Sequence, residues 1–288
     1  MRRTPPWPAR LTWLAAALLS VPALRSALQG HADAVRWVAA TELWVLWTVA
    51  LVATLVPRSV SLTVYRTIAP LSLVAAVWAA FDHASATAAA LAVAGSAAAT
   101  VVACSRFTTD AFVDGSSYGS EQRFGLRTPL FLLIGPVPLA WLVTVVGLAG
   151  PLLLAAQQWL AGAALTVFGI GVARYSTRSL HALARRWVVF VPAGVVLHDP
   201  LVLADAILLP RRQIVALGPA LADTTATDLT DGAPGLVLEV QLADAVELGV
   251  REGRHAAADP VSTDRLLFTP LRPGALLDAA SNRRVPVG

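Results

Sequence analysis

Lysine is absent from this chain, and charged residues make up only 14% of it, whereas hydrophobic residues make up 56%. An ordinary soluble domain is about one quarter charged. The shortage of charge, together with long apolar runs, therefore excludes a typical soluble protein and indicates an integral membrane protein. Because every basic residue other than histidine is arginine and alanine is abundant, the composition is also typical of a GC-rich bacterial genome.

Cysteine is almost absent as well, since Cys104 is the only one. An internal disulfide is therefore excluded, and no Cys or His spacing typical of a zinc site surrounds this residue. We expect Cys104 to be a small buried apolar side chain. The motifs of nucleotide P-loops, zinc proteases and serine hydrolases are missing too, so we expect no cofactor, no metal and no catalytic residues.

The positive charge is unevenly distributed along the chain. Residues 1–186 carry 14 Arg against 6 Asp and Glu, a net charge of +8, whereas residues 187–288 carry 8 Arg against 12, a net charge of −4. The excess of arginine thus belongs to the apolar part, where basic loops set membrane topology. Nucleic acid is not expected as a partner.

Six apolar segments are predicted to form membrane helices, because a bilayer core of about 30 Å needs about 20 apolar residues. They lie near residues 11–28, 37–56, 63–81, 86–104, 129–149 and 151–173. The first segment follows MRRTPPWPAR and also fits a secretory signal peptide, but no clean small-x-small cleavage site follows, so we expect a retained helix. In the fifth segment Pro136 and Pro138 predict a kink. Gly150-Pro151 predicts a tight turn between the last two helices.

Arginine counts in the loops predict the orientation. Alternate loops hold 3, 2, 3 and 4 arginines against 2, 0 and 0 in the others. Since arginine-rich loops stay in the cytoplasm, six helices with both termini cytoplasmic satisfy the pattern. We therefore expect a multi-pass protein of the cytoplasmic (inner) membrane, with residues 1–173 as a transmembrane bundle.

Short strands are predicted after the bundle. A basic amphipathic linker, residues 174–186, leads into WVVFVPAGVVLHDPLVLADAILLPRRQIVALGP, whose short apolar runs alternate with turn residues. We expect a hairpin around Ala243-Asp244, a strand at Arg265–Pro270, and a short closing helix. Residues 187–288 are therefore predicted to form a small β-rich barrel or sandwich.

Three phrases of this region, RRWVVFVPAGVVLHDP, ILLPRRQIVALGP and LLFTPLRPGALLDAA, resemble the bacterial pleckstrin-homology-like (PH-like) domain. The resemblance covers roughly residues 185–288. The whole chain is similar to actinobacterial multi-pass membrane proteins that carry such a domain at the C-terminus. This resemblance implies a β-barrel closed by a short C-terminal helix, and a binding or scaffolding role rather than catalysis. It implies no particular ligand residues.

The polar stretch DGSSYGSEQRFGLRTP, residues 114–129, interrupts the apolar runs. Its glycines, serines and arginines could form an anion-binding nest. It could also be a structural loop whose charges pair with one another, or it could dock onto the net-acidic C-terminal domain. The residues concerned are Asp114, Ser116, Ser117, Tyr118, Glu121, Arg123 and Arg127.

Glu42 is a charge within a predicted membrane helix, and such residues are by default hypotheses of function. Asp82 and His83 end the next helix on the same side and could approach it. An ion or proton path is one interpretation. A Glu that bonds to a neighbouring helix is the other.

Arginines near the end of the last helix are expected to contact anionic lipid head groups: Arg174, Arg178, Arg185 and Arg186. Taken together, these features favour a non-catalytic scaffold or regulator of a membrane or cell-envelope process, acting through lipid and a protein partner of its cytosolic domain. One alternative is a small transporter or channel that uses Glu42. Another is a membrane enzyme that acts on a lipid at the 114–127 loop.

Overall fold

The computed structural model describes residues 6–82, 84–251 and 257–288, which form two compact units. The helical unit comprises Met1–Phe112 and Gly135–His181, and the sheet unit comprises Val113–Ile134 and Ala182–Gly288. The expected division assigned all of residues 1–173 to the bundle. In the structure, residues 113–134 belong instead with the C-terminal residues.

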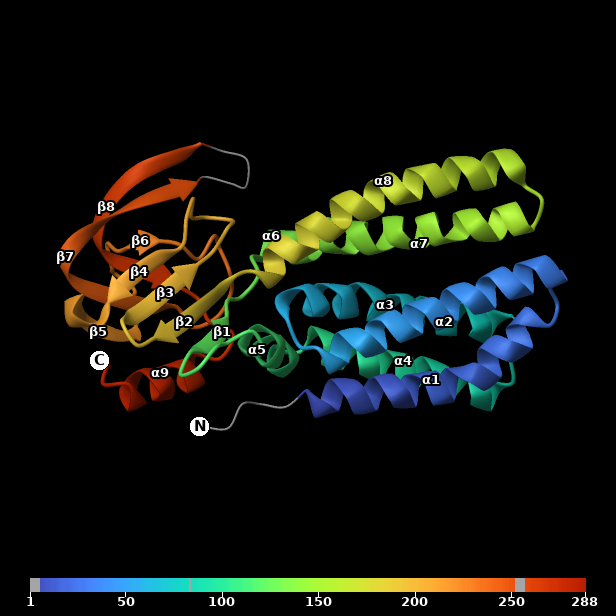
Figure 1. Cartoon of the computed structure of the whole chain (residues 1–288), viewed down its shortest axis with the longest axis horizontal. Coiled ribbons are helices and arrows are strands. Elements are labelled where there is room, and N and C mark those ends of the chain that lie inside the picture. Colours follow the sequence, from blue (N-terminus) through green and yellow to red (C-terminus); the bar gives the residue numbers. More distant parts are fainter. Residues whose placement is uncertain (1–5, 83, 252–256) are drawn as a thin grey trace. The chain divides into compact units, whose positions relative to one another are not determined.

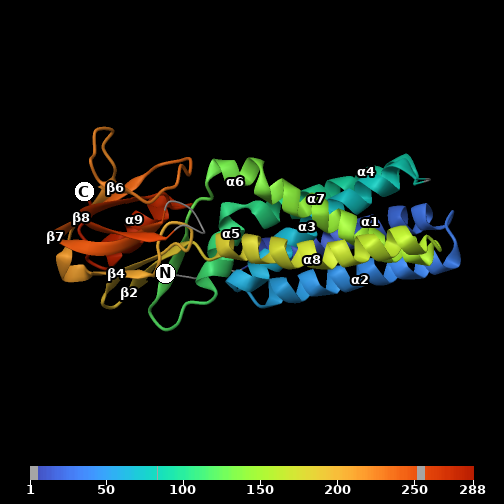
Figure 2. The same ribbon diagram turned by 90° about the horizontal axis from the view of Figure 1, so that it is seen from above.

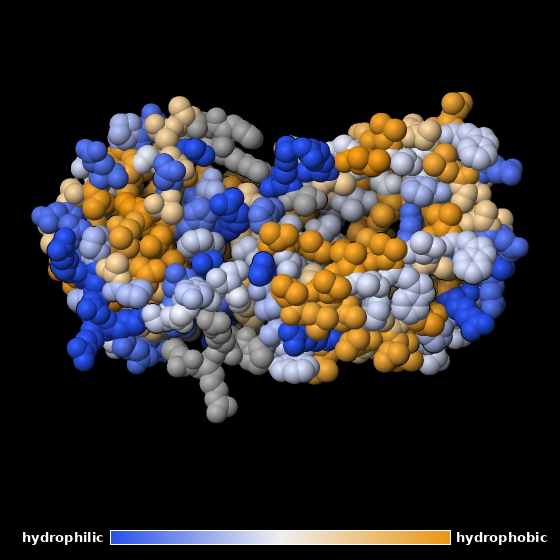
Figure 3. All heavy atoms as spheres, in the orientation of Figure 1, coloured by the Kyte–Doolittle hydropathy of each residue, from blue (hydrophilic) through white to orange (hydrophobic). Residues whose placement is uncertain are grey.

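Within the described residues, the first part of the chain is helical, with six long helices and the two short helices α5 and α6 (Figure 1). They are α1 (Trp7–Leu28), α2 (Asp33–Leu55), α3 (Ser59–Phe81), α4 (Ala86–Cys104), α5 (Arg106–Asp114), α6 (Leu130–Ile134), α7 (Pro136–Ala155) and α8 (Trp159–Ala184). Helices α1 to α4 and the segment Leu130–Ala155 are long and apolar enough to cross a membrane, and α8 holds a shorter apolar section, Trp159–Arg174. The prediction of several helices that are long and apolar enough to cross a membrane is confirmed. Figure 3 shows patches of apolar side chains, interspersed with more polar ones, on the visible face of the helical unit.

Small side chains bring α1, α3 and α4 together. Ala23, Ala76 and Ala92 are fully buried where these helices meet. A Cβ built on Gly95 would lie 3.0 Å from Leu19 Cδ1, so α4 approaches α1 closely. Cys104 is exposed at the end of α4, so the expectation that it is buried is wrong, because the helix turns its alanines inward there.

Two expectations about the last helices need correction. The kink at the prolines is a complete break, since α6 ends before Gly135 and α7 begins at Pro136. The turn predicted at Gly150-Pro151 is wrong, because α7 continues to Ala155 and the chain reverses at 156–158, where Gln157 has φ 62°. The two helices then run side by side (Figures 1 and 2), and Gly150 packs against Thr166 of α8. Gly150 therefore serves helix packing and not the turn.

The sheet unit holds two four-stranded sheets. Its strands are β1 (Gln122–Gly125), β2 (Trp187–Val191), β3 (Gly194–His198), β4 (Ile207–Pro210), β5 (Ile214–Pro219), β6 (Thr227–Asp228), β7 (Leu238–Arg251) and β8 (Ala258–Phe268), followed by helix α9 (Pro273–Asn282). One sheet has the antiparallel order β1-β2-β3-β4, and the other has the order β5-β7-β8-β6 with β6 parallel to β8. Within the described residues the strands do not close into a barrel.

The hairpin predicted around Ala243-Asp244 is wrong. Strand β7 runs through this dipeptide, and a register shift between Gln241 and Val246 accommodates it as a bulge. The extra residues of the bulge are exposed, so polar Asp244 remains in solvent without a chain reversal.

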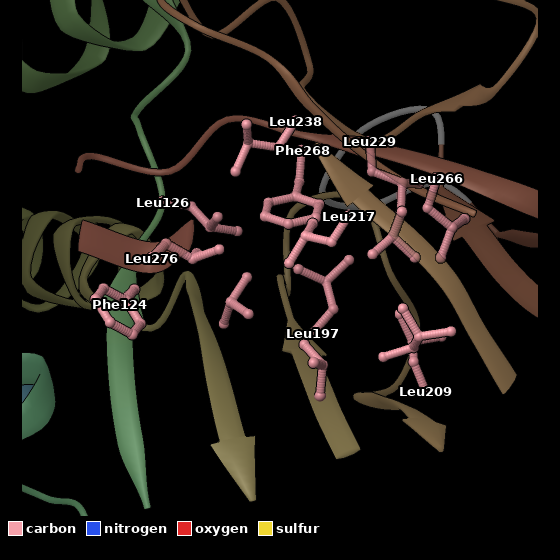
Figure 4. Close-up of a cluster of buried hydrophobic side chains, with 14 of the residues drawn as sticks. Phe124, Leu126, Leu197, Leu209, Leu217, Leu229, Leu238, Leu266, Phe268 and Leu276 are labelled. Carbon is pink, nitrogen blue, oxygen red and sulfur yellow. The ribbon is translucent and has the colours of Figure 1, made fainter. Parts of the chain in front are cut away.

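The core of the sheet unit combines side chains from both sheets and from α9 (Figure 4). Leu197 of β3, Leu217 of β5 and Leu276 of α9 are at most 2% exposed. Phe124 and Leu126, which precede α7 and α8 in sequence, belong to the same cluster. The segment between the apolar helices α4 and α7 therefore contributes to this core.

Candidate functional site

Strand β1 has hydrogen-bonded neighbours on both sides. On one side Gln122 pairs with Phe190 and Gly125 with Trp187 in antiparallel register with β2. On the other side the Gly125 carbonyl accepts a hydrogen bond from the Leu271 N–H, at 2.9 Å, and just after the strand the Arg127 N–H donates to the Thr269 carbonyl. Because its neighbours are both in the C-terminal segment, β1 is an integral strand of the sheet unit.

Asp114 organises the stretch that precedes β1. Its Oδ1 accepts hydrogen bonds from Ser117 Oγ and from the Arg123 N–H, each at 2.9 Å. The Ser116 N–H donates to the Val113 carbonyl. Ser117 is buried, whereas Tyr118 is 86% exposed. The Asp114 carboxylate therefore links the two ends of the 114–123 segment, and the Tyr118 side chain lies at the surface.

Arg123 connects this segment to β2. Its guanidinium lies 4.8 Å from the centre of the Trp187 ring and 3.4 Å from Glu121 Oε2. On β3, the His198 ring lies 4.6 Å from the Trp187 ring. Arg185 Nη2 lies 3.4 Å from His198 Nε2. We call these five residues the arginine-aromatic stack.

The arginine-aromatic stack disfavours a charged histidine. Burial lowers the pKa of His198 below its ordinary value of 6.5, and the cations Arg185 and Arg123 lower it further, whereas Asp199 opposes them. His198 is therefore held in its neutral form across a wider range of pH than a free histidine.

Arg186 is buried, which corrects its expected role as a lipid contact. Its side chain is 2% exposed, and that of its partner Asp199 is 1% exposed. Nε lies 2.8 Å from both carboxylate oxygens of Asp199, Nη2 lies 2.7 Å from Oδ2, and Nη1 donates to the Arg127 carbonyl. Because its donors are directed inward, Arg186 joins β1, β2 and the end of β3 and cannot reach a head group.

Arg127 lies at the edge of a small charged cluster. A Cβ built on Gly235 would lie 2.7 Å from Arg127 Nε, so the chain passes directly beside the guanidinium. Burial raises the pKa of the Asp231 carboxyl, and Asp199 and Asp228 add to the rise against the effect of Arg186. The cluster therefore contains the carboxylates of Asp199, Asp228 and Asp231 and the guanidinium of Arg186, with Arg127 at its edge.

Arg174 and Arg178 are exposed on α8, so their predicted contact with lipid head groups stays a prediction. Arg185 is exposed as well, although it also reaches His198. Helix α8 continues to Ala184, so the segment expected as a separate linker is mostly the end of this helix.

Glu42 lies in a hollow of about 280 Å³ on the helical unit, lined by Trp37, Val38, Thr41 and Pro151. Asp82 is not part of this hollow and lies 3.8 Å from His31 Nε2. His83, the other predicted neighbour, lies outside the described residues. The structure therefore does not join Glu42 and Asp82 into one site.

The polar side chains of the 114–127 loop are mostly engaged with one another. Ser117 and the Arg123 N–H donate to Asp114, and the Arg123 guanidinium donates to Glu121. Among the residues that the structure describes, Arg123 Nε and Arg127 Nε are buried and have no hydrogen-bond partner. In the described part of the chain, no cluster of His, Cys, Asp and Glu could hold a metal ion.

Sequence reasoning missed Trp187, His198 and Asp199. A signal for the first two was present, because they stand at equal distances from the turn Pro192-Ala193 and therefore pair in its hairpin, as the register shows. Comparison with family models, with curated proteins and with solved structures found no match to this chain.

Proposed function

We propose that this protein is a non-catalytic scaffold or regulator of a membrane or cell-envelope process, and that its sheet unit is the part that binds a partner. One observation carries the proposal: β1, from the loop between membrane helices, completes the sheet formed by β2 to β4. The chain passes between the two units three times, at residues 112–113, 134–135 and 181–182. A partner held by the sheet unit is thereby tied to the membrane at three points.

The proposed class of the sheet unit is PH-like. An antiparallel meander of four strands, an antiparallel group β5-β7-β8 and the closing helix α9 support this proposal. In this interpretation the first strand comes from the membrane loop, and helices α7 and α8 are an insertion between the first and second strands. The domain would then be formed by two separate segments of the chain and not by the C-terminal segment alone.

Strand pairing also supports the proposed topology. Because β1 and β2 share a sheet, the segments that hold them must lie on the same face of the membrane. The chain between them must therefore cross an even number of times, so α8 crosses if α7 does. The arginine-rich loops favour the cytoplasm for that face, with both termini there.

Exposed apolar residues of the sheet unit are the proposed contacts for a protein partner. Leu208 of β4 and Val215 of β5 are 45% and 49% exposed, and Leu221 is 73% exposed. Where exposed apolar side chains gather into a contiguous patch, they often mark a protein contact.

The proposal is tested by gentle purification of the full chain, followed by mass spectrometry of the proteins and lipids that accompany it. We expect a stoichiometric protein that is lost from the double variant Val215→Arg with Leu221→Arg. The matched control Asp223→Arg should retain this protein.

The control residue Asp223 is exposed and lies in the same loop as Leu221. Its replacement by arginine changes the net charge by the same amount as the double variant does, but it removes no apolar contact. Loss of the partner from both variants, or from neither, would contradict the proposed surface.

The alternative functions have their own tests. Glu42→Gln should abolish flux in a transporter that uses this carboxylate. A joint change of Asp114, Glu121 and Arg123 should abolish turnover in an enzyme that acts at the loop. A scaffold would have neither flux nor turnover to lose.

A further inference from the structure

Two pairs of adjacent arginines meet on the surface of the sheet unit. Arg211 and Arg212 begin the short 3₁₀ helix that follows β4, and Arg283 and Arg284 directly follow α9. Arg211 Nη1 donates to the Arg283 carbonyl at 3.2 Å, although the two residues are 72 positions apart in the chain. Arg211, Arg212 and Arg284 are exposed, and Arg283 is partly buried. We call these four residues the double-arginine patch.

Backbone and ring contacts hold the double-arginine patch in place. Arg283 Nη2 donates to the Ser120 carbonyl at 2.6 Å, and its guanidinium lies 5.8 Å from the centre of the Phe190 ring. The Arg211 N–H donates to the Ala193 carbonyl at 2.9 Å. Because the fold already positions Arg211 and Arg283, a ligand needs to order little of the patch when it binds.

Carboxylates of the chain do not neutralise the patch. Among the residues that the structure describes, none of its four arginines forms an ion pair, whereas Arg123, Arg186 and Arg265 of the same unit each lie beside a carboxylate. The sheet unit as a whole carries 12 Arg against 14 Asp and Glu, a net charge of −2. Four positive charges without a counter-charge are therefore gathered on an otherwise acidic unit, and they attract an anionic partner.

Arg284 occupies a position at which glycine is usual. After α9 the Arg284 N–H donates to the Ser281 carbonyl, and the Val285 N–H donates to the Ala280 carbonyl. This helix ending places Arg284 in the left-handed region, with φ 58°. Glycine enters that region most easily, because it has no Cβ. An arginine here therefore carries backbone strain, and the charge of its side chain offers a reason for its presence.

The position of the patch selects the kind of partner. Helix α8 leads into the β2–β3 hairpin at Trp187, at the open end of this hairpin. The patch instead contacts Phe190 and Ala193, at the turn end. Since the two lie at opposite ends of the hairpin, the patch favours a protein segment over the head groups of the bilayer that α8 enters.

The side chains of the patch select the chemistry of that segment. The planar guanidinium of arginine matches a carboxylate, with which it forms paired hydrogen bonds. Exposed Leu208 and Val215 flank Arg211 and Arg212 in the chain, so apolar contacts are available as well. We propose that the double-arginine patch binds an acidic segment, rich in Asp and Glu, of the protein partner. The inference rests on the proposed function, because it assigns the chemistry of the partner that the sheet unit holds.

The test measures the binding of a fluorescein-labelled peptide of eight glutamates to the full-length protein in neutral detergent, by fluorescence anisotropy. We expect the peptide to bind, and the binding to weaken as salt is added, because salt screens exposed charges. A labelled peptide of eight glutamines is the uncharged control and should not bind.

Two variants remove charges from the patch. Arg212→Gln and Arg284→Gly should each weaken peptide binding by about threefold, and together by about tenfold, as expected for exposed ion pairs. Arg284→Gly should do so without lowering the melting temperature, because glycine suits the backbone at this position. Arg265→Gln is the matched control. It removes one positive charge that lies beside Glu239, and it should leave peptide binding unchanged.

Three results with the peptides would overturn the proposal. They are equal binding of the glutamate and glutamine peptides, unchanged binding by the combined variant, and an equal loss of binding in Arg265→Gln. Displacement of the glutamate peptide by phosphatidylglycerol added to the micelles would also overturn it, since the patch would then be a lipid site.

Co-purification separates this inference from the proposed function. The combined variant of Arg212→Gln and Arg284→Gly should lose the protein that accompanies the unmodified chain. If that protein stays bound to the combined variant, this inference is overturned and the proposed function stands. If the peptide binds but no protein accompanies the unmodified chain, the acidic-segment site is supported and the proposed function is overturned.

Discussion

The buried ion pair between Arg186 and Asp199 yields the sharpest prediction for stability. Both side chains are at most 2% exposed, and three nitrogens of Arg186 have bonding partners. Removing one partner of such a pair leaves an uncompensated buried charge, which typically costs about 3–5 kcal/mol. Since a domain is stable by only about 5–15 kcal/mol, Asp199→Asn should remove a large part of the stability of the sheet unit.

The assay is hydrogen exchange of the full-length protein in detergent, read on peptides that cover β2 and β3. We expect the opening free energy there to fall by about 3–5 kcal/mol in Asp199→Asn. The joint change of Arg186→Met and Asp199→Leu should restore most of it, because two apolar side chains leave no charge to desolvate. Glu239→Gln is the control, since its partner Arg265 is 42% exposed, and it should cost less than about 1 kcal/mol.

A loss below about 1 kcal/mol in Asp199→Asn would refute the reasoning. It would mean that water reaches the pair, so that its charges are screened and its geometry contributes little.

Three further predictions concern pH, helix packing and a strained turn. Because the pKa of His198 is lowered in the folded protein, the unfolded chain binds more protons below pH 6.5. The sheet unit should therefore lose stability as the pH falls below 6.5. His198→Gln should remove this dependence of stability on pH, measured as denaturation midpoints at several pH values. Gly169→Leu should separate α7 from α8 and lower the melting temperature in detergent, because a Cβ at this position would collide with Gly147 Cα. The control Gly171→Leu should be tolerated, because a Cβ there would meet nothing within 4 Å. Asp231→Asn should stabilise the sheet unit at neutral pH, because the raised pKa of Asp231 shows that folding disfavours its charged carboxylate. Asparagine also accepts the backbone φ of 52° at this position. The gain in stability should vanish in acid, where the aspartate is protonated.

The apolar helices and most strands could be predicted because their signals are local. Runs such as those of α2 and α4 are set by composition, and the hairpin of β2 and β3 is set by the turn Pro192-Ala193. These features need no knowledge of distant residues.

Strand β1 could not be predicted because its partners are distant. It has four residues, of which only Phe124 is strongly apolar, and its register is set by β2, about 60 residues later. The role of Arg186 was misjudged for the same reason. A basic residue after a membrane helix is typical of a lipid contact, and only the fold places Asp199 opposite it. Local patterns identify elements, whereas long-range pairing decides what the charged residues do.

The separation of β1 from β2 also orders events during synthesis. At about 5–20 residues per second, the ribosome needs roughly 3–12 s to make the chain between them. During that time Phe124 has no sheet to join. If only one of α7 and α8 crossed the membrane, β2 would lie on the opposite face from β1, and Phe124 would stay exposed to proteases. Completion of the sheet therefore requires that α7 and α8 cross together or not at all.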